Sequence, residues 1–159
     1  MVVSENTLKW IMRLYPPLLF QRIWVTGFDE GFKGVKVKIN KSLFNKNYNG
    51  SIFGGTIFAA ADPFYPVLFN QILNPKGDQR LKIWSKSSKI DFLKPALTNL
   101  FFEIKLTVTD IEQAIETLTI VGKYERVFPV DIYNEDGEVC ASIMNEVYVR
   151  DLDFSKKLI

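Results

Sequence analysis

A glycine pair, Gly54-Gly55, opens a long apolar run in which Asp62 is the only charged residue. The run predicts one long helix, roughly residues 55–73, kinked or broken early where Pro63 and Pro66 lack an N–H group. A helix that is apolar almost all round has to be buried. The remainder of the chain must therefore fold around it.

The segments on either side of this helix have the patterns of strands and short helices. In Gly34–Ile39, valine and isoleucine alternate with lysine, so one face should be buried and the other wet. The expected strands are Ile23–Phe28, Gly34–Ile39, 80–92, 100–108, 124–133 and 138–150, and the expected short helices are Glu5–Leu14, with Ser4 as N-cap, and 110–118, with Asp110 as cap. One long helix against an antiparallel sheet is an α+β architecture. We expect a single domain over residues 1–159, with a helical extension at 1–20 and a frayed tail at 151–159.

Composition narrows the possible partners and the compartment. The net charge of +2 gives no strong electrostatic reason to bind nucleic acid or a membrane, and we expect neither as a partner. Cys140 is the only cysteine, which excludes an intramolecular disulfide and suits a reducing interior. No basic-then-apolar leader precedes the first helix, so we expect a cytoplasmic protein.

Histidine is absent from the chain. Its absence removes Ser–His and Cys–His nucleophile pairs, histidine-ligated zinc and an imidazole proton shuttle. We therefore expect no metal and no cofactor. Any chemistry has to use carboxylates, hydroxyls, amides, lysines or backbone dipoles.

The start of the long helix is the best candidate site. Backbone N–H groups at a helix start attract negative charge, and glycine lets a ligand approach them closely. Asp62, about two turns further on, must be paired, exposed to a cleft or chemically employed. Each feature also has a simpler explanation. The glycines could be needed only for a tight turn into the helix, and Asp62 could form an ion pair with a neighbouring cation. Asn47 could form an Asx turn, and the Thr56 hydroxyl could belong only to the helix start.

Six residues at and before this helix stand at a characteristic spacing: Asn47, Gly54, Gly55, Phe58, Ala61 and Asp62. Residues 90–95 and the hairpin at 131–141 add two matching stretches. Together they resemble the hotdog-fold acyl-CoA thioesterases of the phenylacetyl-CoA thioesterase type, over roughly residues 23–150. The resemblance implies a curved antiparallel sheet wrapped around one long central helix. The N-terminal helix and the small helical insertion are similar to an uncharacterised, thioesterase-like branch.

The resemblance also implies roles for individual residues. Asp62 would attack the thioester or activate water, Gly54 or Gly55 would donate an N–H to the oxyanion, and Asn47 would orient the thioester or the water. The implied substrate is a coenzyme A or carrier-protein thioester. The implied assembly is a homodimer, possibly a dimer of dimers, because the helix and the loop meet across the subunit interface.

The chain departs from the family pattern at two positions. Phe53 replaces the histidine before the glycine pair, and Pro63 directly follows Asp62. Both replace polar groups with hydrocarbon. An alternative function is therefore binding of acyl groups without cleavage, and a third is a scaffold with a closed pocket.

Further side chains are candidates for substrate contact. Lys89 and Lys94 belong to a series of lysines along one long strand, which could receive the phosphates of coenzyme A or form a solvated face. Phe53 is a candidate for substrate contact at the helix entry. The aromatic residues that could line an acyl tunnel, or belong to the core, are Phe64, Tyr65, Phe69, Trp84 and Phe92. Thr56, at the start of the helix, is the last candidate for substrate contact.

Overall fold

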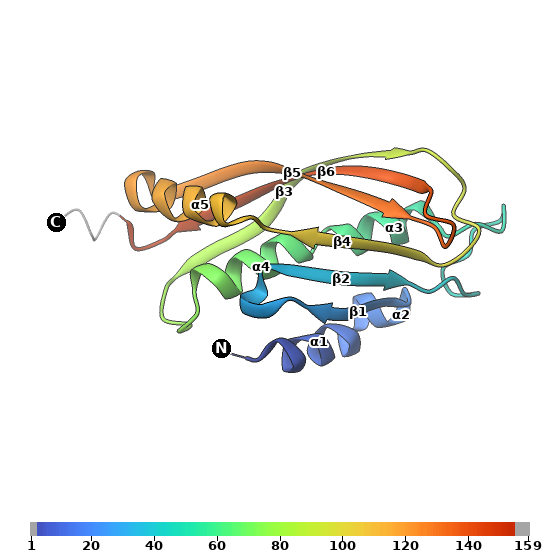
Figure 1. The fold of residues 1–159 in the computed structure, drawn as a ribbon, viewed down its shortest axis with the longest axis horizontal. Coiled ribbons are helices and arrows are strands. Elements are labelled where there is room, and N and C mark those ends of the chain that lie inside the picture. Colours follow the sequence, from blue (N-terminus) through green and yellow to red (C-terminus); the bar gives the residue numbers. More distant parts are fainter. Residues whose placement is uncertain (1–2, 155–159) are drawn as a thin grey trace.

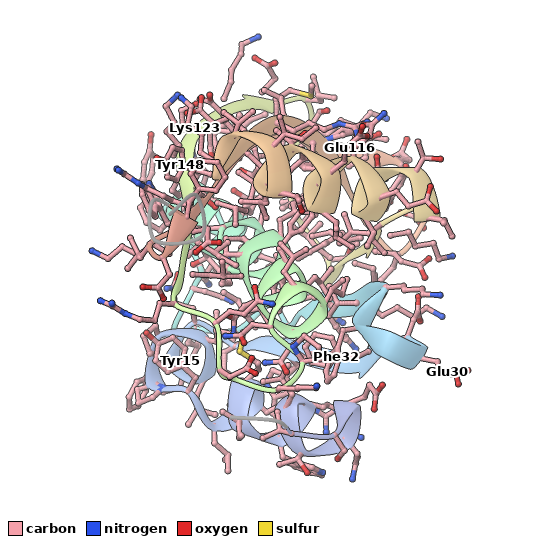
Figure 2. The ribbon with its side chains drawn as sticks, turned by 90° about the vertical axis from the view of Figure 1, so that its left-hand side faces the viewer. Tyr15, Glu30, Phe32, Glu116, Lys123 and Tyr148 are labelled. Carbon is pink, nitrogen blue, oxygen red and sulfur yellow. The ribbon has the colours of Figure 1, made fainter. Side chains whose placement is uncertain are left out.

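The computed structural model describes residues 3–154, which form one curved antiparallel sheet around a central helical segment (Figure 1). The strand order is β1-β2-β4-β5-β6-β3. This arrangement confirms the expected α+β architecture. Seen from one end, α4 runs through the middle of the molecule, with α5 above it and α1 below it (Figure 2).

The six strands are β1 (Ile23–Phe28), β2 (Gly34–Ile39), β3 (Leu81–Phe92), β4 (Leu100–Lys105), β5 (Lys123–Tyr133) and β6 (Val139–Asp151). The helices are α1 (Glu5–Leu14), α2 (Pro16–Phe20), α3 (Gly54–Ala61), α4 (Phe64–Leu73) and α5 (Val108–Val121), with a short 3-10 turn, η1 (Glu30–Phe32). None of the helices in residues 3–154 is long and apolar enough to cross a bilayer.

The alternating sequence of β2 buries one face as expected. Val35, Val37 and Ile39 are buried, whereas Lys36 and Lys38 point outward. The turn 134–137 closes the hairpin of β5 and β6, and Gly137 adopts a positive φ of 78° there. Such a backbone conformation strongly favours glycine.

The long helix predicted for residues 55–73 is two helices, α3 and α4, separated at Asp62 and Pro63. Proline cannot donate to the preceding turn, so the hydrogen-bond ladder is interrupted there. Pro66 lies in the first turn of α4, where a missing N–H costs little. The prolines predicted either a kink or an early break, and the structure has the break. α4 contributes five buried side chains to the core, of which Phe64, Leu68 and Phe69 are fully buried.

The insertion helix α5 is longer than the predicted 110–118, and its cap differs from the prediction. Thr107, rather than Asp110, is the N-cap. Asp110 is the third residue of a capping box, in which Thr107 Oγ1 accepts from Asp110 N and the Asp110 carboxylate accepts from Thr107 N at 2.9 Å. Because this cap begins at Thr107, β4 ends at Lys105 and not at residue 108.

Both ends of the described chain are attached to the body. Ser4 is the N-cap of α1, as predicted. Of the tail expected to fray, Asp151 and Leu152 donate backbone hydrogen bonds to Gly122 and Arg80. Residues 155–159 lie outside the described residues.

The carboxyl group of Asp110 makes the stability of this cap depend on pH. Burial alone would raise the pKa of Asp110, but the hydrogen bonds from Thr107 and the Arg126 guanidinium, 2.8 Å away, outweigh burial and lower it. A pKa below the unfolded value of about 3.9 stabilises the fold above that value. This contribution is lost as the pH falls through the folded pKa.

We therefore expect Asp110→Asn to lower the free energy of unfolding by about 1–2 kcal/mol at pH 7. The difference from the native chain should shrink as the pH falls below about 4, because the native carboxylate is then protonated too. Urea unfolding across this pH range measures both effects. Glu112→Gln, an exposed acid on the same helix, is the control and should change little. An unchanged difference at low pH would contradict the assignment.

Candidate functional site

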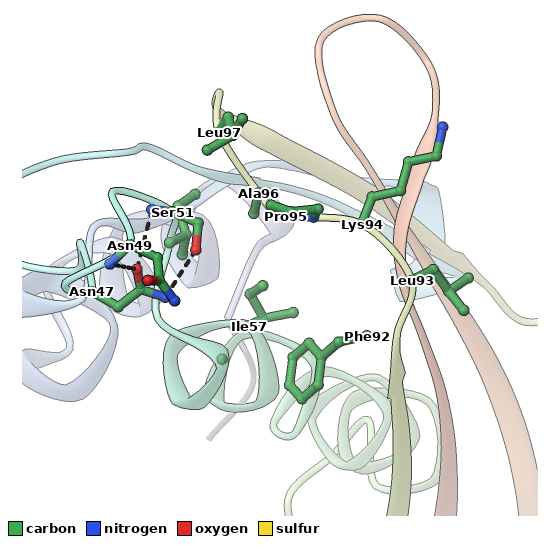
Figure 3. A pocket seen from close by; sticks show the side chains of 12 residues that line it. Asn47, Asn49, Ser51, Ile57, Phe92, Leu93, Lys94, Pro95, Ala96 and Leu97 are labelled. Atoms are coloured by element: carbon green, nitrogen blue, oxygen red, sulfur yellow. Dashed lines mark hydrogen bonds between the residues drawn. The ribbon is translucent and has the colours of Figure 1, made fainter.

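The start of α3 forms one wall of a pocket of about 640 Å³ (Figure 3). The N–H groups of Thr56 and Ile57 donate to Phe53 O, whereas those of Gly54 and Gly55 donate to no other group in residues 3–154. Unpaired N–H groups at a helix start carry a partial positive charge. The pocket is lined by Asn47, Asn49, Ser51, Ile52, Gly54, Ile57, Phe92, Leu93, Lys94, Pro95, Ala96 and Leu97.

Asn47 holds together the loop that leads to this helix. Its Oδ1 accepts from the backbone N–H of Asn49 at 3.0 Å and of Ser51 at 3.2 Å, and its Nδ2 donates to Ser51 Oγ at 2.8 Å (Figure 3). The side chain therefore makes an Asx turn, the simpler of its two explanations. It also lines the pocket, and the second hydrogen on Nδ2 has no acceptor among the described residues.

A buried asparagine that we did not single out from the sequence anchors the other end of the loop. Asn45 Nδ2 donates to Gln21 O and Asn40 O, and its Oδ1 accepts from Ser42 N. All these partners are backbone groups of distant or turning segments. Only its place in an asparagine-rich loop could have marked it in the sequence.

Two aromatic rings pack against the glycine pair. A Cβ on Gly54 would lie 2.9 Å from the Phe92 ring, and one on Gly55 would lie 2.3 Å from the Phe53 ring. Both distances are too short for real contacts. A side chain at either position would make the exposed ring turn away, so the packing favours the steric explanation of the glycines; their N–H groups have no acceptor within residues 3–154. Phe53 itself is the N-cap residue of α3 and more than half exposed.

Asp62 lies at the break between α3 and α4 and is exposed. Within residues 3–154 its carboxylate takes part in no ion pair or hydrogen bond, so the ion-pair explanation has no support there. At 1.5 Å per residue, a helix separates Asp62 from Gly54 by roughly 12 Å along its axis. Within one chain, this separation is longer than a carbonyl group and its contacts would favour.

Side chains from two strands hold the backbone at this break. Ser85 Oγ donates to Asp62 O at 2.9 Å, an oxygen whose usual helical donor would be the N–H that Pro66 lacks. Asn145 Nδ2 donates to Ala61 O at 3.2 Å. Asn145 is buried, and its Oδ1 accepts from Ser88 Oγ at 2.6 Å. We did not single out these three residues from the sequence, because nothing local links them to the break.

The remaining candidates lie apart from the pocket or are already engaged. Tyr65 is buried, stacks on Phe128 with ring centroids 4.7 Å apart and donates to Pro129 O at 2.8 Å. Burial raises the pKa of Tyr65. Thr56 is buried within α3. Of the candidates, the structure brings Asn47, Gly54 and Lys94 together in the pocket wall. The candidates that do not line it are Phe53, Gly55, Thr56, Asp62, Tyr65 and Lys89.

The two candidate lysines are paired with carboxylates. Lys94 forms an ion pair with Glu138, and this hydrogen bond lowers the pKa of Glu138. Lys89 lies 3.0 Å from Asp91. Figure 3 shows the Lys94 side chain extending away from Ile57 and Phe92. Both pairs are exposed, so they favour a solvated face but leave the cations accessible.

Solved structures of other proteins share this fold. PA5026 of Pseudomonas aeruginosa, a protein of unknown function described as a probable thioesterase, is similar with a TM-score of 0.79 and 19% identity, over 95% of this chain and 98% of that one. Thioesterase HI1161 of Haemophilus influenzae is similar with a TM-score of 0.68 and 13% identity, over 96% of this chain and 94% of that one. The PaaI protein of the Escherichia coli phenylacetic acid degradation operon is similar with a TM-score of 0.58 and 17% identity, over 94% of this chain and 96% of that one. The chain has the hotdog fold.

The family follows from the sequence itself. Residues 5–149 match the family described as "Domain of unknown function (DUF4442)", and the chain belongs to this family. No curated protein sequence matches the chain significantly. The hotdog fold expected from the helix-entry residues is confirmed.

Asn145 should be the most sensitive polar residue of the helix break. Asn145→Ala leaves Ala61 O without its side-chain donor and removes the acceptor of Ser88, which should cost about 1–3 kcal/mol. Chemical denaturation measures the loss. Asn70→Ala, at an exposed position of α4, is the matched control and should change stability by less than about 0.5 kcal/mol. Equal losses in both variants would show that the Asn145 hydrogen bonds contribute nothing.

Proposed function

We propose that the protein hydrolyses acyl thioesters, with coenzyme A or a carrier protein as the thiol. The observation that carries this proposal is the start of α3, where the unpaired backbone N–H of Gly54 stands at the wall of a pocket and that of Gly55 follows it in the same turn. A thioester carbonyl oxygen becomes negative in the tetrahedral state, and a preorganised N–H donor stabilises that charge. The thioesterase names of structural relatives are consistent with this chemistry.

The carboxylate of Asp62 supplies the second group that the reaction needs. It either takes a proton from water as the water attacks the carbonyl carbon, or attacks that carbon itself to form a mixed anhydride that water then cleaves. In both routes the C–S bond breaks and the thiolate leaves. The net reaction consumes one water and yields a carboxylate, a thiol and a proton. No histidine or metal is required.

The site is composite, with Asp62 and the glycine N–H groups contributed by two copies of the chain. Asp62 is exposed and held next to Ser85 in the middle of β3. β3 is an edge strand of twelve residues, and its outer side pairs with no strand within residues 3–154. Such an edge is a template for another strand. Antiparallel pairing of β3 with its counterpart in a second copy would bring each Asp62 toward the other chain.

The proposal also covers the residues that bind the thiol part of the substrate and the compartment. Lys89 and Lys94 would meet the phosphates of coenzyme A, exchanging their present carboxylate partners for the ligand. The reaction would take place in the cytoplasm, where a single unpaired cysteine such as Cys140 is usual.

One observation favours the alternative, an acyl-binding protein without hydrolysis. The rings of Phe53 and Phe92 pack against Gly55 and Gly54, so hydrocarbon surrounds the two donors. A pocket of this kind would hold an acyl group well and a developing oxyanion less well. Calorimetric binding of acyl-CoA with no thiol release would establish this second function in place of the first.

Asp62→Asn should reduce thiol release from acyl-CoA at least a hundredfold, since general-base catalysis contributes about 10²–10⁴ in rate. A thiol reagent measures release across short, long and aryl acyl-CoAs. Asp78→Asn, an exposed acid in the loop after α4, is the control and should retain full activity. Undiminished turnover by Asp62→Asn would remove Asp62 from the mechanism.

A mixing experiment tests the composite site. Gly54→Val places a side chain against the Phe92 ring, so this variant and Asp62→Asn should each be inactive. Co-expressed, they form heterodimers in which one of the two sites combines an intact Asp62 with an intact Gly54. Random assortment should restore about a quarter of native activity, because half of the dimers are mixed. Complete failure to restore activity, with both variants folded and dimeric, would place both groups in one chain.

A further inference from the structure

The charge of the chain is divided unevenly between its parts. Residues 1–46 contain eight lysines and arginines against three acids, whereas the remaining residues contain twelve against fifteen. The small net charge of +2 therefore conceals a basic part and an acidic part. The basic part supplies α1, α2, β1 and β2, which lie along the lower side of the molecule in Figure 1.

The basic side chains of this part are also less neutralised than the others. Within residues 3–154, Lys36 is the only one of the eight that forms an ion pair with a carboxylate. Seven of the ten basic residues at 47–154 form such pairs. The charge of the N-terminal part thus remains available to an external anion.

Large apolar side chains are exposed in the same region. α1 buries Leu8 and Met12 against the body, but its outer side presents Trp10 and Leu14 to solvent. Leu43 and Phe44 are 86% and 81% exposed. The residues that are at least half exposed here are Trp10, Leu14, Tyr15, Phe20, Leu43 and Phe44, and we call this set, with Lys9, Arg13, Arg22, Lys41 and Lys46, the basic face.

Two contacts hold the basic face together. The Arg13 guanidinium lies over the rings of Trp10 and Trp24, at 4.8 Å and 5.4 Å from their centroids, which fixes α1 on β1. Asn45 Nδ2 donates to Gln21 O and thereby ties the loop that carries Leu43 and Phe44 to the end of α2. These contacts fix α1 on β1 and the loop on the end of α2.

We propose that the basic face docks onto the surface of an anionic lipid bilayer. Tryptophan and tyrosine favour the headgroup level of a bilayer, leucine and phenylalanine enter the acyl boundary, and lysine and arginine attract anionic headgroups. The contact is peripheral. The overall charge gave no reason to expect a membrane partner, but the charge that faces outward here does.

Two other occupants fit the face less well. A second copy bound through a two-fold axis would oppose the face to itself, which places unpaired cations against cations. Single-stranded nucleic acid stacks its bases on aromatic rings, but it offers nothing to exposed aliphatic groups such as Leu14 and Leu43. Lipid satisfies both the cationic and the aliphatic components.

Vesicle flotation with the full chain tests the proposal. Vesicles of phosphatidylcholine with roughly one third phosphatidylglycerol should carry the protein, and added salt should weaken binding because it screens the charges. Leu43→Ser with Phe44→Ser, and separately Lys9→Gln with Lys46→Gln, should each weaken binding at least tenfold. The matched controls are Val108→Ser with Ile120→Ser, exposed apolar residues of α5, and Lys76→Gln with Lys82→Gln; both should bind as the native chain does.

The remaining outcomes overturn the proposal. Absence of flotation, or equal loss in the control and face variants, would show that the face binds no bilayer. A sedimentation coefficient that falls when Leu43 and Phe44 are replaced would show that a second copy covers the face. Binding of a labelled oligonucleotide in place of vesicles, lost in the lysine variant, would assign it to nucleic acid.

Discussion

The interruption of the central helix at Asp62 and Pro63 is the feature on which the arrangement of this protein depends. An apolar helix in the middle of a curved sheet is stabilised by burial, yet a proline inside it leaves backbone carbonyl groups without donors. Ser85 in the sheet donates to Asp62 O, which faces the missing N–H of Pro66, and Asn145 donates to Ala61 O, the last carbonyl of α3. The break is thereby fixed to β3 and β6, and the only acid of the helix is held at the edge of the sheet and not in the core.

The element pattern was accessible from the sequence because burial has a periodicity that can be read locally. β2 alternates strictly, and the paired prolines locate the break in the long helix. The α5 cap was placed wrongly, although the spacing of Thr107 and Asp110 is that of a capping box. Cap propensity alone does not distinguish the two residues, whereas this spacing does.

The candidate site was accessible only in part, for a physical reason. Asn47 and Gly54 lie together because only six residues of loop and turn separate them, which a sequence can suggest. Asn145 is 84 positions from Ala61, and Phe92 is 38 positions from Gly54. Such contacts arise from the topology of the sheet. A glycine pair in the sequence therefore indicates that space is needed, without revealing which ring occupies it.

The glycine pair also explains why hydrolysis and binding are close alternatives for one architecture. The absence of a Cβ admits the Phe53 and Phe92 rings to the start of α3, and the same absence exposes two N–H groups. Hydrocarbon around a donor strengthens its electrostatic effect by lowering the local dielectric, provided that the ligand oxygen reaches the N–H. Where the rings instead block that approach, the same packing yields an acyl pocket. The orientation of two exposed phenyl rings thus decides between an oxyanion site and a binding site.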